Sequence, residues 1–146
     1  MADSDLMNLY STRILALAAD IPMTERLETP QASVKKRAPL CGSTVTVDLN
    51  LSDGHVSAFA QDVKACALGQ AAASVVGANI VGTSAAQIKT ARDQLRDMLK
   101  SDGPAPSTPF DGLKVLEPAR EFKNRHASIL LALEASLEAT EQIENQ

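Results

Sequence analysis

Aromatic side chains are scarce in this sequence, whose 146 residues include no Trp, one Tyr and three Phe. Proteins that bind single-stranded nucleic acid usually stack the bases on exposed rings, so this scarcity argues against such a function. An excess of positive charge is also missing, because the formal net charge is −4. Binding to a phosphate backbone needs a basic surface. The sequence therefore predicts a protein that does not bind nucleic acid.

Long apolar runs are missing, and cysteine is rare. No apolar segment is long enough to cross a bilayer, and no signal-peptide pattern is present. The only two cysteines, Cys41 and Cys66, do not form the dense framework of a secreted disulfide scaffold. A hydrophobic content of 45% is enough for one ordinary core. We therefore expect a single domain over residues 1–146 in the cytoplasm, with reduced thiols and no membrane association.

Hydrophobic periodicity predicts an α+β domain. Alternating apolar and polar residues indicate strands over 33–38, 44–51 and 55–63, the last two joined by a hairpin turn at Ser52-Asp53-Gly54. Apolar residues spaced by three and four predict helices over 5–19, from Cys66 towards Gly77, from Ser84 to Leu99 and over 119–143, with a shorter helix or turn over 110–117. Gln87 is placed to complete a capping box with Ser84. The strands form a small antiparallel meander.

Two cysteines flank the predicted hairpin and are the first candidates for a functional site. Cys41 precedes the strand at 44–51 and Cys66 follows the return strand, so the hairpin should bring both thiols to one end. Cys66 also begins a predicted helix, whose unpaired N–H groups and dipole favour the thiolate. Each cysteine alone would fit a packing role, because free cysteine is among the most buried residue types.

His126 is the third candidate. It falls on the apolar stripe of the last predicted helix with Leu130 and Leu133. A histidine on such a stripe is usually a hydrogen-bonded core residue. Two thiolates and an imidazole nevertheless form a suitable three-ligand set for zinc or iron. A nucleophile–base pair of Cys66 and His126 lacks an identifiable third residue to orient the base, and no phosphate-binding or hydrolase motif is present.

These residues, in this order, resemble the U-type iron–sulfur cluster scaffold family, which includes IscU and the N-terminal domain of NifU. The resemblance covers nearly the whole chain. It rests on Cys41-Gly42 before a strand, Ala65-Cys66-Ala67 before a small-residue helix, and His126-Ala127-Ser128-Ile129-Leu130 in the last helix. It implies a SufE/NifU-like α+β fold, with a three-stranded antiparallel sheet and about four to five helices packed on it. It also implies that Cys41, Cys66 and His126 hold iron, a nascent iron–sulfur cluster or zinc.

The sequence departs from the family pattern at the ligands themselves. Ser43 stands where the family has Asp, so we expect it to be at most a weak ligand, because its hydroxyl is normally neutral. Ala127 stands at the position that the resemblance assigns to a third cysteine, and Ala65 replaces the glycine before the second. An alanine in place of a thiolate removes a strong ligand for an iron–sulfur cluster. We therefore predict a divergent member of the family.

The predicted function is that of a scaffold-like protein of iron–sulfur cluster assembly, and not that of an enzyme. The resemblance implies docking to a cysteine desulfurase, and apo iron–sulfur proteins are further candidate partners. Cys41 or Cys66 would also be able to accept persulfide sulfur from the desulfurase. Two alternatives stay open: a non-metal interaction module of the same fold, and a thiol redox protein that uses a Cys41–Cys66 pair.

Overall fold

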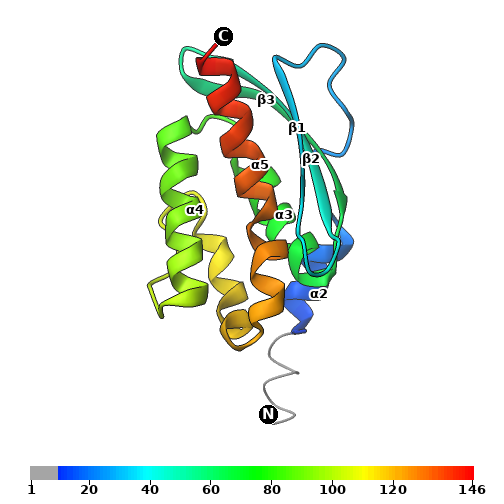
Figure 1. Ribbon diagram of the computed structural model, residues 1–146, viewed down its shortest axis with the longest axis vertical. Coiled ribbons are helices and arrows are strands. Elements are labelled where there is room, and N and C mark those ends of the chain that lie inside the picture. Colours follow the sequence, from blue (N-terminus) through cyan, green and yellow to red (C-terminus); the bar gives the residue numbers. More distant parts are fainter. Residues whose placement is uncertain (1–9) are drawn as a thin grey trace.

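The computed structural model describes residues 10–146, which form a three-stranded antiparallel sheet with helices packed on it (Figure 1). In chain order the helices and strands are α2 (Thr12–Ala19), β1 (Ala32–Arg37), β2 (Thr44–Ser52), β3 (His55–Lys64), α3 (Ala67–Asn79), α4 (Ala85–Lys100), η1 (Asp111–Glu121), η2 (Lys123–Arg125) and α5 (His126–Glu144). The predicted α+β fold class is confirmed. The first part of the helix expected over 5–19 lies outside the described residues.

The sheet is the predicted meander, with strand order β1-β2-β3. β1 pairs with β2 from Ala32 opposite Leu49 to Arg37 opposite Thr44. β2 turns back into β3 at Asp53-Gly54, where both residues have positive φ, as a tight hairpin turn requires. At the open end of the hairpin, farthest from this turn, Thr44 pairs with Lys64. That end therefore places the residues before β2 next to those after β3.

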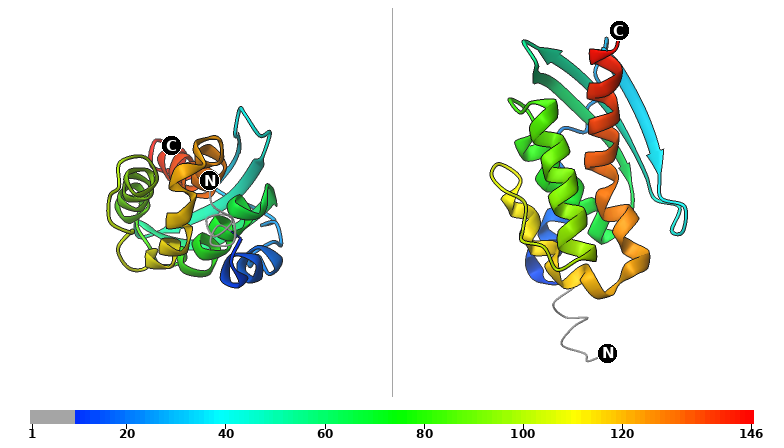
Figure 2. Two further views of the ribbon diagram at one scale, coloured as in Figure 1. Left: turned by 90° about the horizontal axis from the view of Figure 1, so that it is seen from below. Right: turned by 60° about the vertical axis from the view of Figure 1, so that its left-hand side comes forward.

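Helices form two further layers on the core face of the sheet. α5 packs against β1 and β2, while α3 packs against β3, α2 and α5. α4 and η1 form the outer layer, with α4 packed on α5 (Figure 2). At Gly69 in α3, an added Cβ would lie only 2.5 Å from Ser128 Oγ of α5. Glycine at this position is what lets the two helices approach so closely. No helix among residues 10–146 is long and apolar enough to cross a membrane.

The last helix is shorter than its apolar pattern predicted. α5 begins at His126, and the preceding residues form the 3₁₀ segments η1 and η2 instead of continuing an α-helix from 119. Pro118 lies inside η1, where its ring and missing N–H disfavour an α-helical ladder over the residues that precede it. Arg120 fixes this segment by donating to the carbonyls of Met98 and Gly103, at 2.6 and 2.9 Å.

Asp48 is buried although it lies on the polar side of the alternating pattern of β2. It is only 1% exposed, because the loop before β1 covers the outer face of the sheet at this point. Its carboxylate accepts from Arg26 Nε at 2.6 Å, Arg26 Nη2 at 2.9 Å, Leu27 N at 3.1 Å and Ser33 Oγ at 2.7 Å. The Arg26 guanidinium, followed by these other donors, holds the pKa of Asp48 below its ordinary value. This carboxylate therefore ties the loop to the sheet.

The variant Asp48→Asn should lower the free energy of unfolding at pH 7 by about 1–3 kcal/mol, because it removes a charge-assisted hydrogen-bond set from a buried site. In the wild type, this stabilisation is complete above the ordinary aspartate pKa of about 3.9 and disappears as the pH falls through the lower, folded pKa. Urea unfolding between pH 7 and pH 3 measures both effects. Asp62→Asn, an exposed carboxyl on β3, is the control; equal shifts in both variants would contradict this role of Asp48.

Candidate functional site

Cys41 and Cys66 lie at the open end of the hairpin, opposite its turn, as their positions in the sequence predicted. Cys41 sits in the exposed turn between β1 and β2, which is held by hydrogen bonds from Ala38 N to Ser43 O and from Gly42 N to Ala38 O. Gly42 has φ +73°, a conformation that side chains disfavour. Cys66 is half-buried and caps the start of α3 without a side-chain cap hydrogen bond. Neither thiol is in a disulfide.

Two serine hydroxyls join the thiols into one chain of polar atoms. Cys41 Sγ lies 3.1 Å from Ser43 Oγ, Ser43 Oγ lies 3.1 Å from Ser128 Oγ, and Ser128 Oγ lies 3.5 Å from Cys66 Sγ. Ser43 is 5% exposed and Ser128 is 1% exposed. We call these four residues the thiol–hydroxyl cluster. Its members come from the turn before β2, the start of α3 and the first turn of α5.

Ser128 is the member that the sequence analysis missed. The resemblance had aligned Ala127 with the third cysteine, but Ala127 is exposed and Ser128 is the α5 residue that reaches the thiols. Neighbouring helical residues differ by about 100° around the axis, so a one-residue shift changes the face completely. Two signals could have identified it: Ser128 shares a buried face with small residues such as Ala132 and Ala135, and Gly69 provides the space opposite it.

His126 lies apart from the cluster. It is 3% exposed, and its Nε2 lies 3.0 Å from Ala119 O and 3.1 Å from Arg120 O. Because both partners are carbonyl oxygens, Nε2 carries the proton and donates. Among residues 10–146, no group of three or more His, Cys, Asp or Glu side chains is arranged to hold a metal ion. The structure therefore assembles Cys41, Ser43 and Cys66 but does not bring the imidazole of His126 to them.

The surroundings of Cys41 favour its thiolate. The Ser43 hydroxyl lowers the pKa of the Cys41 thiol, helped by the Ser43 backbone N–H and the Ser128 hydroxyl, while partial desolvation opposes the shift. A hydroxyl has one proton to donate. Cys66 can therefore donate to Ser128, Ser128 to Ser43, and Ser43 to a thiolate at Cys41. This order satisfies every member of the chain when Cys41 is ionised.

The donor set of the cluster fits a soft metal ion weakly. Thiolate sulfur is a preferred ligand of zinc, iron and iron–sulfur clusters. The cluster provides two thiols, while its two hydroxyls contribute neutral oxygen where a carboxylate or a third thiolate would add charge. Such a set carries at most two negative charges and only two sulfur ligands. It should therefore hold a metal less firmly than a set with a carboxylate or a third thiolate, which suits a transient occupant.

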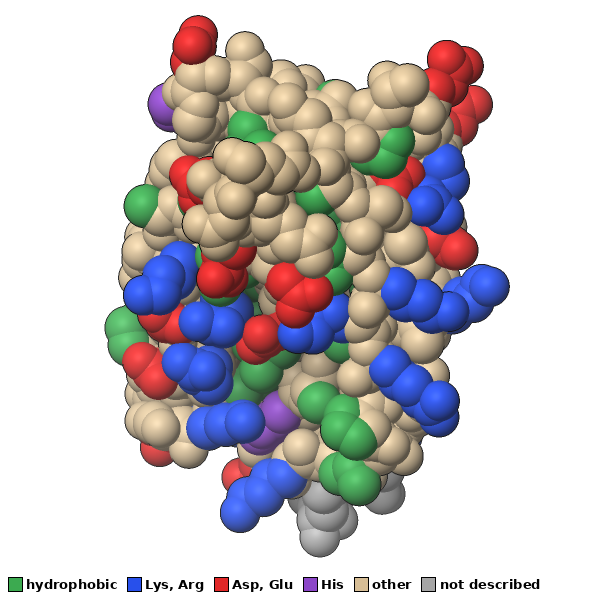
Figure 3. All heavy atoms as spheres, turned by 45° about the horizontal axis from the view of Figure 1, so that its top comes forward, with side chains coloured by type: hydrophobic (Ala, Val, Ile, Leu, Met, Phe, Trp, Pro, Cys, Tyr) green, Lys and Arg blue, Asp and Glu red, His purple; other side chains and the backbone are tan. Residues whose placement is uncertain are grey.

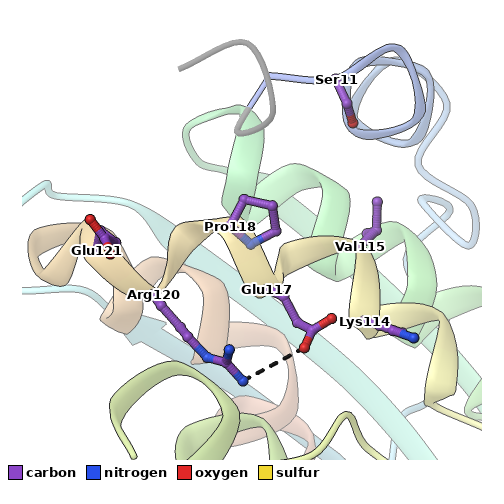
Figure 4. Close-up of a pocket in the computed structure, with 7 residues that line it drawn as sticks. All are labelled: Ser11, Lys114, Val115, Glu117, Pro118, Arg120 and Glu121. Carbon is purple, nitrogen blue, oxygen red and sulfur yellow. Dashed lines mark ion pairs between the residues drawn. The ribbon is translucent and has the colours of Figure 1, made fainter. Parts of the chain in front are cut away.

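A hollow of about 730 Å³ lies elsewhere, between the start of α2 and η1. In Figure 4 the side chains of Glu117 and Arg120 lie on one side of η1, where they form an ion pair, whereas Pro118 lies towards Ser11, the N-cap residue of α2. None of the four residues of the thiol–hydroxyl cluster lines this hollow. Its position gives it no part in thiol chemistry.

Comparison with known proteins identifies solved structures with this fold. No family model matches the chain, and no curated protein matches its sequence. A nitrogen-fixing NifU-like protein (N-terminal) from Brucella abortus is 44% identical, with a TM-score of 0.95, over 97% of this chain and 99% of that one. A protein named as an iron–sulfur cluster assembly scaffold for the SUF system, from Fervidobacterium islandicum AW-1, is 15% identical, with a TM-score of 0.82, over 92% of this chain and 98% of that one. A hypothetical protein is 17% identical, with a TM-score of 0.79 and the same two coverages. The last two share the fold alone.

The variant Ser43→Ala should raise the pKa of the Cys41 thiol, because it removes the hydroxyl that stabilises the thiolate. Alkylation of Cys41 at pH 7 should then slow by roughly twofold to tenfold, as the thiolate fraction falls. The rate of iodoacetamide modification against pH, followed by peptide mass spectrometry, gives this pKa. Ser136→Ala removes a buried hydroxyl from the same face of α5, where it bonds to Ala132 O, and should leave the profile unchanged. A profile that Ser43→Ala does not move would contradict the assigned hydrogen bond.

Proposed function

The chain belongs to the family of NifU-like N-terminal proteins, and from this premise we propose that it is a divergent scaffold of iron–sulfur cluster assembly. Its cargo is iron, zinc or a nascent iron–sulfur cluster, held transiently by Cys41 and Cys66. It acts as a carrier and not as an enzyme. Its partners are a cysteine desulfurase and apo iron–sulfur proteins, and it works in the cytoplasm.

The thiol–hydroxyl cluster is the observation that supports this proposal. Two thiols from separate elements converge on buried hydroxyls at the end of the hairpin, with an exposed turn that gives access from solvent. Ser43 takes the place that the family gives to Asp. The Ser128 side chain lies within hydrogen-bond range of both Ser43 and Cys66. Ser43 thus puts a neutral hydroxyl where the family pattern has a charged ligand, and Ala127 removes the third thiolate. The proposed consequence is a site that releases its cargo more readily than a fully charged set.

Anaerobic reconstitution with ferrous iron and sulfide, and separately with zinc, tests the ligand set through metal content and visible absorbance. Cys41→Ala and Cys66→Ala should each lower the bound metal by roughly tenfold or more, since each removes one of two thiolates. His126→Ala should retain the metal level of the wild type, because the imidazole is turned to the carbonyls of Ala119 and Arg120.

The variant Ser128→Cys is the complementary gain of function. A third thiol at this position should strengthen metal binding and stabilise the chromophore, whereas Ser136→Cys, at a buried site on the same helix, should not. Absence of metal from both the wild type and Ser128→Cys would contradict the scaffold proposal. Loss of metal from His126→Ala as large as that from Cys41→Ala would contradict the exclusion of His126 from the ligands.

Sulfur acceptance is a second candidate function, favoured by the exposure of Cys41 and by its lowered pKa. In this reaction the Cys41 thiolate attacks the outer sulfur of a desulfurase persulfide. A new S–S bond forms at Cys41, the S–S bond of the donor breaks, and the desulfurase cysteine leaves as a thiolate, so no external oxidant is needed.

Incubation with a cysteine desulfurase and free cysteine should therefore add about 32 Da, the mass of one sulfur atom, to Cys41. Cys66→Ala should keep this gain and Cys41→Ala should lose it. Sulfur found on Cys66 alone would contradict the assignment of Cys41 as the acceptor. A wild type that takes neither sulfur nor metal, and whose double cysteine variant still binds its partner proteins, would favour the interaction-module alternative.

A further inference from the structure

A groove lined by basic side chains lies along α4, first between α4, β1 and α5 and then between α4, η1, η2 and the start of α5. It consists of a hollow of about 270 Å³ and a second of about 420 Å³, and Lys100 lines both. The floor of the first is formed by Leu130, Leu131 and Ala127 of α5. We call this feature the basic groove; its cationic side chains are Lys36, Arg37, Arg96, Lys100, Arg120 and Lys123.

Positive charge dominates the basic groove although the chain as a whole carries −4. Glu134 is the acidic residue that lines it, and its carboxylate already pairs with Arg92 at 3.3 Å. Lys36, Arg96 and Arg120 also have acidic partners. Among residues 10–146, no acidic side chain forms an ion pair with Arg37, Lys100 or Lys123. Figure 3 shows Lys and Arg side chains along the α4 side of the molecule, with Asp and Glu side chains among them.

The groove ends beside the thiol–hydroxyl cluster. Arg37 Nη2 lies 3.6 Å from the point that a Cβ on Gly42 would occupy, so its guanidinium borders the turn that carries Cys41. Pro39 lines the groove, and the next residue, Leu40, is 80% exposed. A chain bound along the groove would therefore meet an apolar contact and then Cys41 at its end.

We infer that the basic groove binds an acidic segment of a partner protein that also carries an apolar side chain, and that it holds this segment beside Cys41. The unpaired cations supply charge complementarity, and the Leu130, Pro39 and Leu40 side chains supply apolar contact. A nucleic acid fits less well, because its phosphates would leave the apolar floor of the groove unused and exposed aromatic platforms are scarce. A small inorganic anion would leave the apolar surface unused.

This inference deepens the proposed function and rests on it, since the segment would belong to the partner that delivers sulfur to Cys41. Its test uses a fluorescein-labelled peptide of about twelve residues, about 40 Å long when extended, with glutamates interspersed with leucines. Fluorescence anisotropy with the full chain should show binding that weakens as salt screens the charges. Arg37→Glu combined with Lys100→Glu should weaken it roughly tenfold or more.

Lys89→Glu combined with Lys114→Glu is the matched control, because it makes the same charge change at exposed positions that line neither hollow. It should change the affinity less than about twofold, the scale of a long-range, screened effect. Equal weakening by the two double variants would overturn the inference. So would undiminished binding of a peptide with serine in place of leucine, efficient competition by inorganic phosphate, or tighter binding of a single-stranded oligonucleotide.

Binding to the groove does not require the thiols, which separates this inference from the proposed function. The double variant Cys41→Ala and Cys66→Ala should bind the acidic peptide as the wild type does, even though it takes no metal and no sulfur. Loss of peptide binding in this variant would overturn the groove as the docking site. A wild type that binds the peptide but neither metal nor sulfur would overturn the proposed function and leave the docking site standing.

Discussion

The close approach of α3 and α5 is the constraint on which the thiol–hydroxyl cluster depends. Gly69 has no side chain to hold the helices apart, so the Ser128 hydroxyl of α5 lies within hydrogen-bond range of both Cys66 and Ser43. Cys66 itself is placed by the end of β3, and Ser43 by the start of β2. The antiparallel hairpin and the helix contact therefore act together, and neither alone would bring two thiols to a common pair of hydroxyls.

Charge is what distinguishes this cluster from a strong metal site. A carboxylate and three thiolates would together carry several negative charges, whereas two thiols and two hydroxyls carry at most two. The hydroxyls act instead on Cys41: when its thiol is ionised, Ser43 can donate to the thiolate, and this lowers the pKa of the thiol. A hydroxyl at Ser43 in place of a carboxylate therefore weakens the hold on a cation and raises the thiolate fraction of Cys41. Charged ligands would favour holding a metal at this site, whereas neutral hydroxyls favour accepting sulfur at Cys41.

Sequence patterns were sufficient for the meander, because Val45, Val47 and Leu49 alternate cleanly and Asp53-Gly54 marks the turn. They also placed Cys41 beside Cys66, since a hairpin joins its own ends. They could not place Ser128, because choosing between neighbouring residues of a helix requires the rotation of α5, which packing against Gly69 determines. His126 was assigned to the thiols from its donor chemistry and from the family resemblance. The carbonyls that it contacts, those of Ala119 and Arg120, belong to the 3₁₀ segment η1, where the apolar pattern had predicted the start of the last α-helix.

The claim that two thiols and two hydroxyls form the binding site is tested most directly by X-ray absorption at the zinc edge on the zinc-loaded wild-type protein. The expected spectrum has two sulfur scatterers at about 2.3 Å and oxygen scatterers at about 2.0 Å, the usual ligand distances of zinc. Imidazole is not expected in the first shell, because His126 Nε2 donates to backbone carbonyls of η1. The multiple-scattering pattern of a histidine ligand, or a shell with fewer than two sulfurs, would contradict the account.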